Sequence, residues 1–176
     1  FVAELKQGGA SSYVTVFAAA SGNAAENDIK SRVTVYVEQI QAGKMENRME
    51  TVKSSEIQQA MSRDGKVAIY GVLFDTDKAD IKPESAPQLE EMGRYLQQNP
   101  SVAVYVVGHT DNQGKLDYNL NLSQRRAEAV VTALSTTYKV ARTRLVGKGV
   151  ANLAPVASNQ SDEGRAKNRR VELVLQ

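Results

Sequence analysis

An acid, several amides and two arginines stand close together between two apolar segments, in the stretch "GHTDNQGKLDYNLNLSQRRAEAV" at residues 108–130. Asp111 lies at the beginning of this stretch and Arg126 lies near its end. A carboxylate accepts hydrogen bonds from an ammonium group, whereas a guanidinium presents a planar fork of donors that matches a carboxylate. Three hypotheses therefore compete: an ion pair that only holds a loop together, a catalytic centre, and a receptor for a ligand that carries both charges.

The rest of the chain gives little support to a catalytic centre. The chain has no cysteine, and its single histidine, His109, has no serine in a strained turn to form a triad with it. Glu90 and Glu91 are adjacent on a predicted helix, so they point about 100° apart and form a solvated face rather than an acid/base pair. We expect no enzymatic activity and no cofactor, and His109 is interpreted as a structural or rim residue.

Two further classes of partner are also disfavoured. The string "DTDKAD" at residues 75–80 resembles a calcium loop, but Asp80 stands where the loop needs glycine and Ala86 where it needs an acid. No metal site is therefore predicted. The 22 basic and 20 acidic residues give a net charge of +2, and no extended basic stripe is present, so we expect no nucleic-acid partner.

One local basic cluster remains, formed by Lys167, Arg169 and Arg170. The simplest interpretation is a solvated or salt-bridged start of a strand. Contact with an acidic polymer is the alternative.

The N-terminal part of the chain predicts a β-hairpin and a short helix. The segments at residues 10–20 and 32–41 alternate in apolar character, and a polar, turn-forming stretch separates them. A short helix is predicted near Ser55, which with Gln58 fits a capping box, and it should end at "RDG", residues 63–65. We treat residues 1–65 as an extension and residues 66–176 as the principal domain.

The remaining segments predict a two-layer α/β domain. Strands are expected at residues 66–75, 101–109, near 144–149 and 169–176. One helix should follow Pro83, and a second should begin at Ser123 as its N-cap, whereas residues 159–168 read as a polar loop. The strand at 101–109 is apolar on both faces, which favours burial on both sides. The order strand, helix, strand, helix, strand, strand (βαβαββ) is typical of such domains.

This arrangement brings Asp111 and Arg126 to one crevice. Asp111 follows a predicted central strand, and Arg126 lies in the first turn of a helix that must return beside it, at the edge where α/β sheets hold ligands. A helix N-terminus also favours an anion. The crevice therefore suits a zwitterion. The alternative is that the two side chains pair with each other, which contributes roughly 0 to 1 kcal/mol when exposed.

Three blocks of sequence resemble the OmpA C-terminal-like family. The pattern T-D-x-x-G followed by N-x-x-L-S-x-x-R-A is matched by Thr110, Asp111, Gly114, Asn119, Leu122, Ser123, Arg126 and Ala127. "VLFDTDKADIKPES" resembles the opening motif of the family, and "NRRVEL" resembles its closing strand. The chain departs from the pattern at Lys139, where a glycine often follows the second helix, so that connection is expected to differ in shape.

The resemblance implies non-covalent binding of peptidoglycan through diaminopimelate of its stem peptide, whose side chain ends in an ammonium and a carboxylate. Asp111 should take the ammonium and Arg126 the carboxylate. The opposite rim should be formed by Phe74, Asp75, Thr76 and Asp77, and the loop and pocket wall by Thr110, Asn119 and Leu122.

The resemblance also implies a place in the cell. It favours the periplasm of a Gram-negative bacterium, with the outer membrane reached through a segment absent from this chain. The alternative role is the wall anchor of a larger machine, such as a motor stator or a secretion complex. The role of residues 1–65 and the formation of a homodimer stay open.

Overall fold

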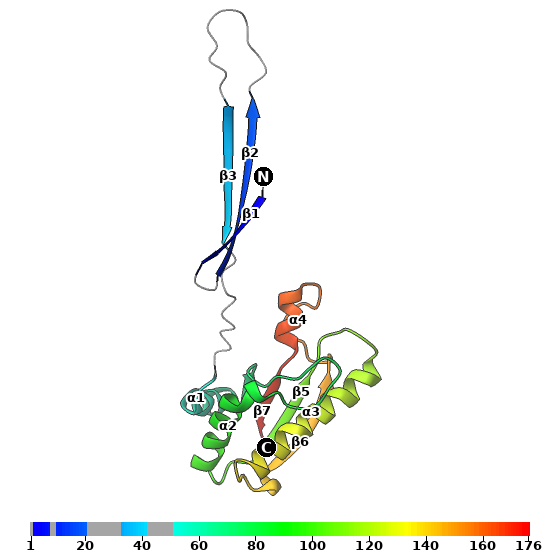
Figure 1. Cartoon of the computed structure of the whole chain (residues 1–176). Coiled ribbons are helices and arrows are strands. Elements are labelled where there is room, and N and C mark those ends of the chain that lie inside the picture. Colours follow the sequence, from blue (N-terminus) through cyan, green and yellow to red (C-terminus); the bar gives the residue numbers. More distant parts are fainter. Residues whose placement is uncertain (1, 8–9, 21–32, 42–50) are drawn as a thin grey trace, which may run out of the picture. The chain divides into compact units, whose positions relative to one another are not determined.

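The computed structural model describes residues 2–7, 10–20, 33–41 and 51–176 (Figure 1). The chain divides into two compact units, Phe1–Arg48 and Met49–Gln176. None of the helices in the described ranges is both long enough and apolar enough to cross a bilayer.

The first unit contains a three-stranded antiparallel sheet. Its strands are β1 (Val2–Gln7), β2 (Ala10–Ala20) and β3 (Val33–Gln41), in the order β1-β2-β3. The predicted hairpin is confirmed, because β2 and β3 pair antiparallel with Val16 opposite Val37. The turn predicted between them falls on residues outside the described ranges. The strand β1 was not predicted.

The second unit is the two-layer α/β domain that the sequence predicted. Its elements in chain order are α1 (Ser54–Asp64), β4 (Lys66–Ile69), the 3-10 turn η1 (Pro83–Ser85), α2 (Ala86–Gln98), β5 (Val104–His109), α3 (Leu116–Thr136), the 3-10 turn η2 (Arg142–Arg144), β6 (Leu145–Ala151), α4 (Asp162–Asn168) and β7 (Val171–Leu175). The sheet order is β4-β7-β5-β6, with β5 parallel to β6 and antiparallel to β7. Helices α1, α2 and α3 form the second layer (Figure 1).

The core lies between the sheet and these helices. It includes Ile57, Met61, Ile69, Leu89, Met92, Leu96, Val104, Val106, Val130, Val131, Leu134 and Leu173. The other face of the sheet is partly open, because Tyr105 is 38% exposed. The predicted burial of β5 on both faces is therefore wrong: alternate residues of β5 meet the helices, and the residues between them do not.

Helix α1 contributes Ile57 and Met61 to this core. The second compact unit therefore begins at Met49, and the boundary predicted between residues 65 and 66 falls inside it. The helix starts after Lys53, whose backbone N–H donates to Glu56 at 2.8 Å, and not at a box of Ser55 and Gln58. It ends as predicted at Gly65, whose φ of 68° is the left-handed conformation that glycine adopts readily.

Two other predictions of local structure are wrong. Strand β4 ends at Ile69 instead of residue 75, and Phe74 forms only an isolated bridge with Ile81. Residues 162–168 form α4 where a loop was expected. Lys139, where the family often has glycine, adopts a left-handed φ of 58°, and the expected difference in the shape of this connection stays a prediction.

The start of α3 is the error that bears most on the site. The helix begins at Leu116, and Ser123 is a fully buried residue inside it. Its hydroxyl donates to the carbonyl of Leu120 and accepts from the N–H of Ala151 on β6. Ser123 therefore fastens α3 to the sheet instead of capping a helix, and Arg126 lies well inside α3 instead of in its first turn.

Candidate functional site

A cavity of about 1080 Å³ opens at the carboxyl end of β5. Its walls come from residues 70–77, from the loop that follows β5, from α3, and from α4 with the start of β7. All nine residues predicted for the site line it: Phe74, Asp75, Thr76, Asp77, Thr110, Asp111, Asn119, Leu122 and Arg126. The structure thus brings together segments that are up to about 100 residues apart in the chain.

Arg126 is held by the loop on the opposite side of the pocket. Its Nε donates to the carbonyl of Lys78 at 2.9 Å, and its Nη2 donates to the carbonyl of Asp75 at 3.1 Å. Its guanidinium carbon lies 4.9 Å from the centre of the Phe74 ring, a cation–π distance. Partial burial lowers the pKa of Arg126, and the charge of Asp77 opposes that shift. An arginine remains a cation in this setting.

The acids on the rim of this loop are engaged differently. The carboxylate of Asp75 lies 3.5 Å from the ammonium groups of both Lys78 and Lys82, and the hydrogen bond from Lys78 and the charge of Lys82 lower its pKa. Asp77 has a φ of 60°, so it forms the left-handed corner of the turn. The carboxylate of Asp75 thus contacts the two lysines, and its backbone carbonyl accepts a hydrogen bond from Arg126.

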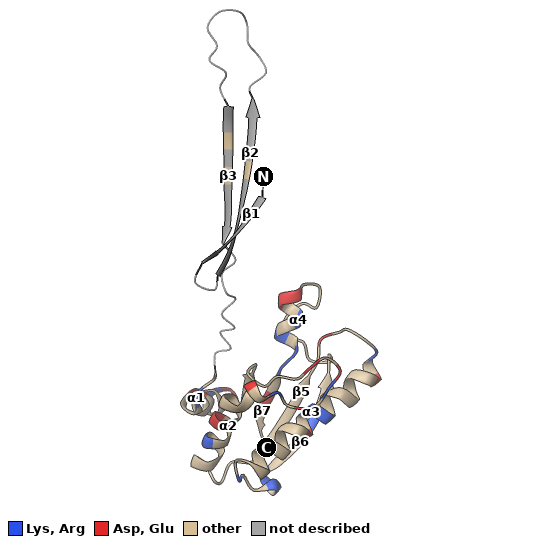
Figure 2. Cartoon of the chain, viewed as in Figure 1, with Lys and Arg blue, Asp and Glu red and all other residues tan. Residues whose placement is uncertain are grey.

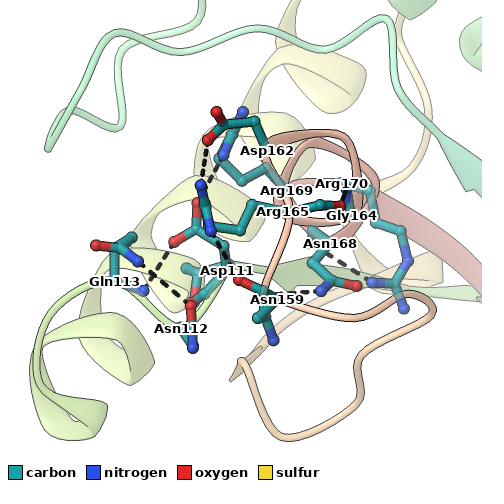
Figure 3. Close-up of polar contacts among 12 residues, drawn as sticks. Asp111, Asn112, Gln113, Asn159, Asp162, Gly164, Arg165, Asn168, Arg169 and Arg170 are labelled. Atoms are coloured by element: carbon teal, nitrogen blue, oxygen red, sulfur yellow. Dashed lines mark hydrogen bonds and ion pairs between the residues drawn. The ribbon is translucent and has the colours of Figure 1, made fainter.

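Asp111 is bound on both sides of its carboxylate. Its Oδ1 accepts the backbone N–H of Gln113 at 3.0 Å, and its Oδ2 pairs with Nη1 of Arg169 at 2.6 Å (Figure 3). Only 12% of the Asp111 side chain is exposed. Within the described part of the chain, no ion pair joins Asp111 to Arg126. The simple hypothesis of a mutual ion pair is therefore wrong, because each charge has its own partner.

The loop between Asp111 and α3 is fixed from within. The side-chain amide of Asn119 donates to the carbonyl of Gln113 at 2.8 Å, and the hydroxyl of Thr110 donates to the carbonyl of Asp111 at 2.8 Å. Gly114 turns the chain with a φ of 87°, which side chains other than glycine rarely adopt. Asn119 and Thr110 thus shape the wall that carries Asp111.

The OmpA sequence profile matches residues 73–169, more than half of the chain. This range includes all nine predicted site residues and the arginine that pairs with Asp111. The chain belongs to the OmpA family.

Similar proteins agree with this assignment. The probable lipoprotein YiaD of Escherichia coli (strain K12) is 45% identical over 105 residues, which are 59% of this chain and 47% of that protein. The cell wall anchor of the T6SS from Pseudomonas aeruginosa has a TM-score of 0.56 and 31% identity, over 72% of this chain and 98% of that chain. The peptidoglycan-associated lipoprotein from Burkholderia pseudomallei has a TM-score of 0.54 and 34% identity, over 60% of this chain and 88% of that chain. The match of this OmpA-family chain spans between 28% and 65% of the length of these curated relatives, and 47% of YiaD.

Arg169 is the site residue whose role in this OmpA-family chain was missed. It was seen only as part of a basic cluster, yet it reaches Asp111 because β7 runs antiparallel to β5. The register places Val171 opposite Gly108, and the carbonyl of Arg170 accepts the N–H of His109 at 3.0 Å. Residues just before β7 therefore lie beside residues just after β5. The sequence offers no direct signal for this register.

His109 and Arg170 line the same cavity but belong to a buried cluster. Arg170 pairs with Glu172 at 2.7 Å, and Nε2 of His109 lies 3.8 Å from Glu172. Burial, together with the charge of Arg170, lowers the pKa of His109 to about 4. Neither ring nitrogen has a hydrogen-bond partner among the described residues. A neutral, buried histidine of this kind is a structural residue.

Charges of both signs are distributed over the helices and loops of the described second unit (Figure 2). No group of three or more acidic, histidine or cysteine residues in the described ranges is arranged to hold a metal ion.

Proposed function

We propose that this chain binds peptidoglycan non-covalently, through the zwitterionic end of diaminopimelate in the stem peptide. One observation carries the proposal: Asp111 and Arg126 line the same cavity but do not neutralise each other. A ligand with an ammonium and a carboxylate on one carbon presents the complementary pair of charges. The nine residues Phe74, Asp75, Thr76, Asp77, Thr110, Asp111, Asn119, Leu122 and Arg126 form its site.

Arg126 takes the carboxylate in this proposal. A guanidinium has five N–H donors, and two of those of Arg126 are used by the carbonyls of Lys78 and Asp75. The others are available for a ligand carboxylate. Because the two carbonyls and the Phe74 ring already hold the guanidinium, little side-chain freedom is lost when the ligand binds.

Asp111 takes the ammonium. One oxygen of its carboxylate accepts the backbone N–H of Gln113, and the other pairs with Arg169, which lines the same cavity. Apolar contact for the methylene chain of the ligand comes from Phe74 and Leu122, which line the same space. The pocket then recognises a short aliphatic chain that ends in two opposite charges.

The proposal predicts selectivity between wall types. A stem peptide with lysine in place of diaminopimelate has the ammonium but no carboxylate, so it leaves Arg126 without its ligand partner. A hydrogen bond to a charged group contributes about 1.5 to 3 kcal/mol, which corresponds to roughly tenfold to hundredfold in affinity. Many equivalent sites on one polymer raise the retention above the affinity of a single site.

Similarity supports a tethering role. One relative is described as a peptidoglycan-associated lipoprotein and another as a cell wall anchor of a secretion system. We infer that this domain lies in the periplasm of a Gram-negative bacterium and links the outer membrane or an envelope protein to the wall. The second candidate is the anchor of a larger envelope machine, which the similarity to the secretion-system anchor over 98% of that chain favours.

Pull-down on purified sacculi tests the site. Asp111→Ala and Arg126→Ala should each abolish retention without unfolding the domain, as judged by circular dichroism. Arg125→Ala is the matched control, because Arg125 is the exposed neighbour of Arg126 and bonds only Asn121 among the described residues. Retention of the Asp111, Arg126 double variant at the level of the unaltered chain would refute the site assignment.

The absence of catalysis is tested with the same material. Sacculi incubated with the chain should release no soluble fragments, because the proposal contains no bond-breaking step. Calorimetric titration with a diaminopimelate muropeptide and with its lysine counterpart measures the selectivity. Equal affinity for the two muropeptides would contradict the role given to Arg126.

A further inference from the structure

The two adjacent arginines before β7 differ sharply in how they are held. Arg170 has 2% of its side chain exposed and donates to Glu172, to the carbonyl of Asn168 and to the carbonyl of Ala154. Arg169 is 50% exposed, and Asp111 is its one side-chain partner in the described part of the chain. Figure 3 shows the two side chains extending in opposite directions. Arg170 is thus a structural residue, whereas Arg169 is held by a single contact.

The contact of Arg169 occupies the oxygen that the ligand needs. Asp111 has 12% of its side chain exposed, and its Oδ1 is already bound to the N–H of Gln113. The Oδ2 atom bonds Arg169, and Arg169 lines the same cavity as Asp111. An ammonium that approaches Asp111 from the side of Arg169 meets the same atom, and two cations at hydrogen-bond distance from one oxygen repel each other.

We propose that Arg169 is a displaceable counter-ion, which neutralises Asp111 in the empty pocket and which the ammonium of the ligand must replace. This inference rests on the proposed function and names a residue that sets the affinity of that site. The exchange leaves no charge buried and unpaired, because the guanidinium of Arg169 moves into water while the ammonium takes its place. The contact also gives the mostly buried carboxylate of Asp111 a partner of opposite charge before the ligand arrives.

The displacement has a defined consequence for affinity. Binding must break the contact between Arg169 and Asp111, so the observed affinity is lower than that of a pocket without this competitor. The same opposition applies to every ligand that offers an ammonium, whether or not it also has a carboxylate. Arg169 therefore lowers the affinity for diaminopimelate and lysine ligands together, and the discrimination between them comes from Arg126.

Calorimetric titration of the Arg169→Gln chain with the two muropeptides tests this inference. Both muropeptides should bind more tightly than to the unaltered chain, by a similar factor of roughly fivefold, the equivalent of a partly exposed ion pair. Arg169→Ala is the second neutral variant, and Arg169→Lys, which keeps a cation within reach of Asp111, should bind like the unaltered chain. Arg125→Gln controls for the general loss of one positive charge near the pocket and should change the affinity much less.

The outcomes separate this inference from the function on which it rests. If the unaltered chain binds the diaminopimelate muropeptide and Arg169→Gln binds it with equal or lower affinity, Arg169 is a ligand contact or a support for Asp111, and the inference is overturned while the proposed function stands. If the unaltered chain binds neither muropeptide, the proposed function is overturned, and this inference falls with it.

Discussion

Arg126 is held on three sides by its own chain, whereas Asp111 is held on one side by its backbone and on the other by an arginine that is half exposed. Two carbonyls and an aromatic ring fix the cationic end of the pocket. The anionic end has the N–H of Gln113 as a fixed partner and Arg169 as a second one. The two ends of one pocket therefore differ in how much must change when a ligand binds.

This difference gives the two ends separate roles: the Arg126 end positions the ligand, and the Asp111 end balances charge. A preorganised guanidinium loses little freedom when a carboxylate docks, so the cationic end can set the position of the ligand. At the anionic end Asp111 already pairs with Arg169, so under the counter-ion proposal binding exchanges one cation for another. The carboxylate of the ligand would then supply specificity, and its ammonium would supply a replacement for Arg169.

Gly108→Ala should disturb both ends at once and have the largest effect. A Cβ at this position would lie 2.4 Å from the carbonyl oxygen of Ser123, so α3, which carries Arg126, would have to move away from β5, which leads to Asp111. We expect the free energy of unfolding to fall by about 3 kcal/mol and muropeptide binding to be lost. Urea denaturation and calorimetry measure the two effects.

The control for this variant is Gly65→Ala. Gly65 has a positive φ of 68° and open space around its Cβ position, so the substitution introduces backbone strain of about 1 kcal/mol without moving α3. Binding should be unchanged in this control. A Gly108→Ala chain that binds normally would show that the spacing of the two ends does not matter.

Acid should weaken the fold beneath the anionic end. The pKa of His109 is lowered to about 4 in the native state, below the usual 6.5, so the unfolded chain binds a proton that the native chain does not bind between these values. The free energy of unfolding therefore falls as the pH falls from about 6.5 to 4, by on the order of 2 kcal/mol at pH 5.

Urea denaturation between pH 7.5 and 4.5 measures this effect, with His109→Gln as the matched variant. The glutamine cannot take up the proton, so its stability should be flatter over the same pH range. Parallel curves for the two chains would contradict the assignment of the pH dependence to His109.

Arg126→Lys tests whether the cationic end depends on geometry or on charge alone. A lysine keeps the positive charge but has only three donors and no planar fork, so it cannot bond both carbonyls of the loop and also both oxygens of the ligand carboxylate. Affinity for the diaminopimelate muropeptide should fall by about 1.5 kcal/mol, roughly tenfold. The lysine muropeptide, which lacks that carboxylate, should bind nearly as before.

The sequence predicted which residues line the pocket better than it predicted which side chains contact one another there. The two-layer domain followed from the apolar periodicity, and the placement of Asp111 after a central strand and Arg126 on the next helix was enough to expect one crevice. That expectation survived an error in the start of α3, because Arg126 needs only to lie on the part of the helix that packs beside β5. The prediction that the N-terminus of this helix helps to bind an anion beside Arg126 was wrong, because α3 begins ten residues earlier, at Leu116.

The partner of Asp111 could not be found in the same way. It depends on the antiparallel register of β7 against β5, which pairs residues 63 to 71 positions apart and leaves no local pattern. Helix α4 was more accessible: the side chain of Ser161 accepts from Gly164, acidic residues follow it, and basic residues lie in the last turn. The polar composition of that segment concealed these capping signals.

Phe74→Leu is the mildest way to loosen the cationic end. Leucine retains the apolar contact but removes the ring whose centre lies 4.9 Å from the guanidinium carbon of Arg126. The loss of a cation–π contact at a partly exposed site should weaken muropeptide binding by about 0.5 to 1 kcal/mol, roughly twofold to fivefold. Phe74→Tyr keeps the ring and should bind like the unaltered chain. If leucine and tyrosine bind alike, then the two backbone carbonyls alone hold Arg126, and the cationic end is fixed on two sides instead of three.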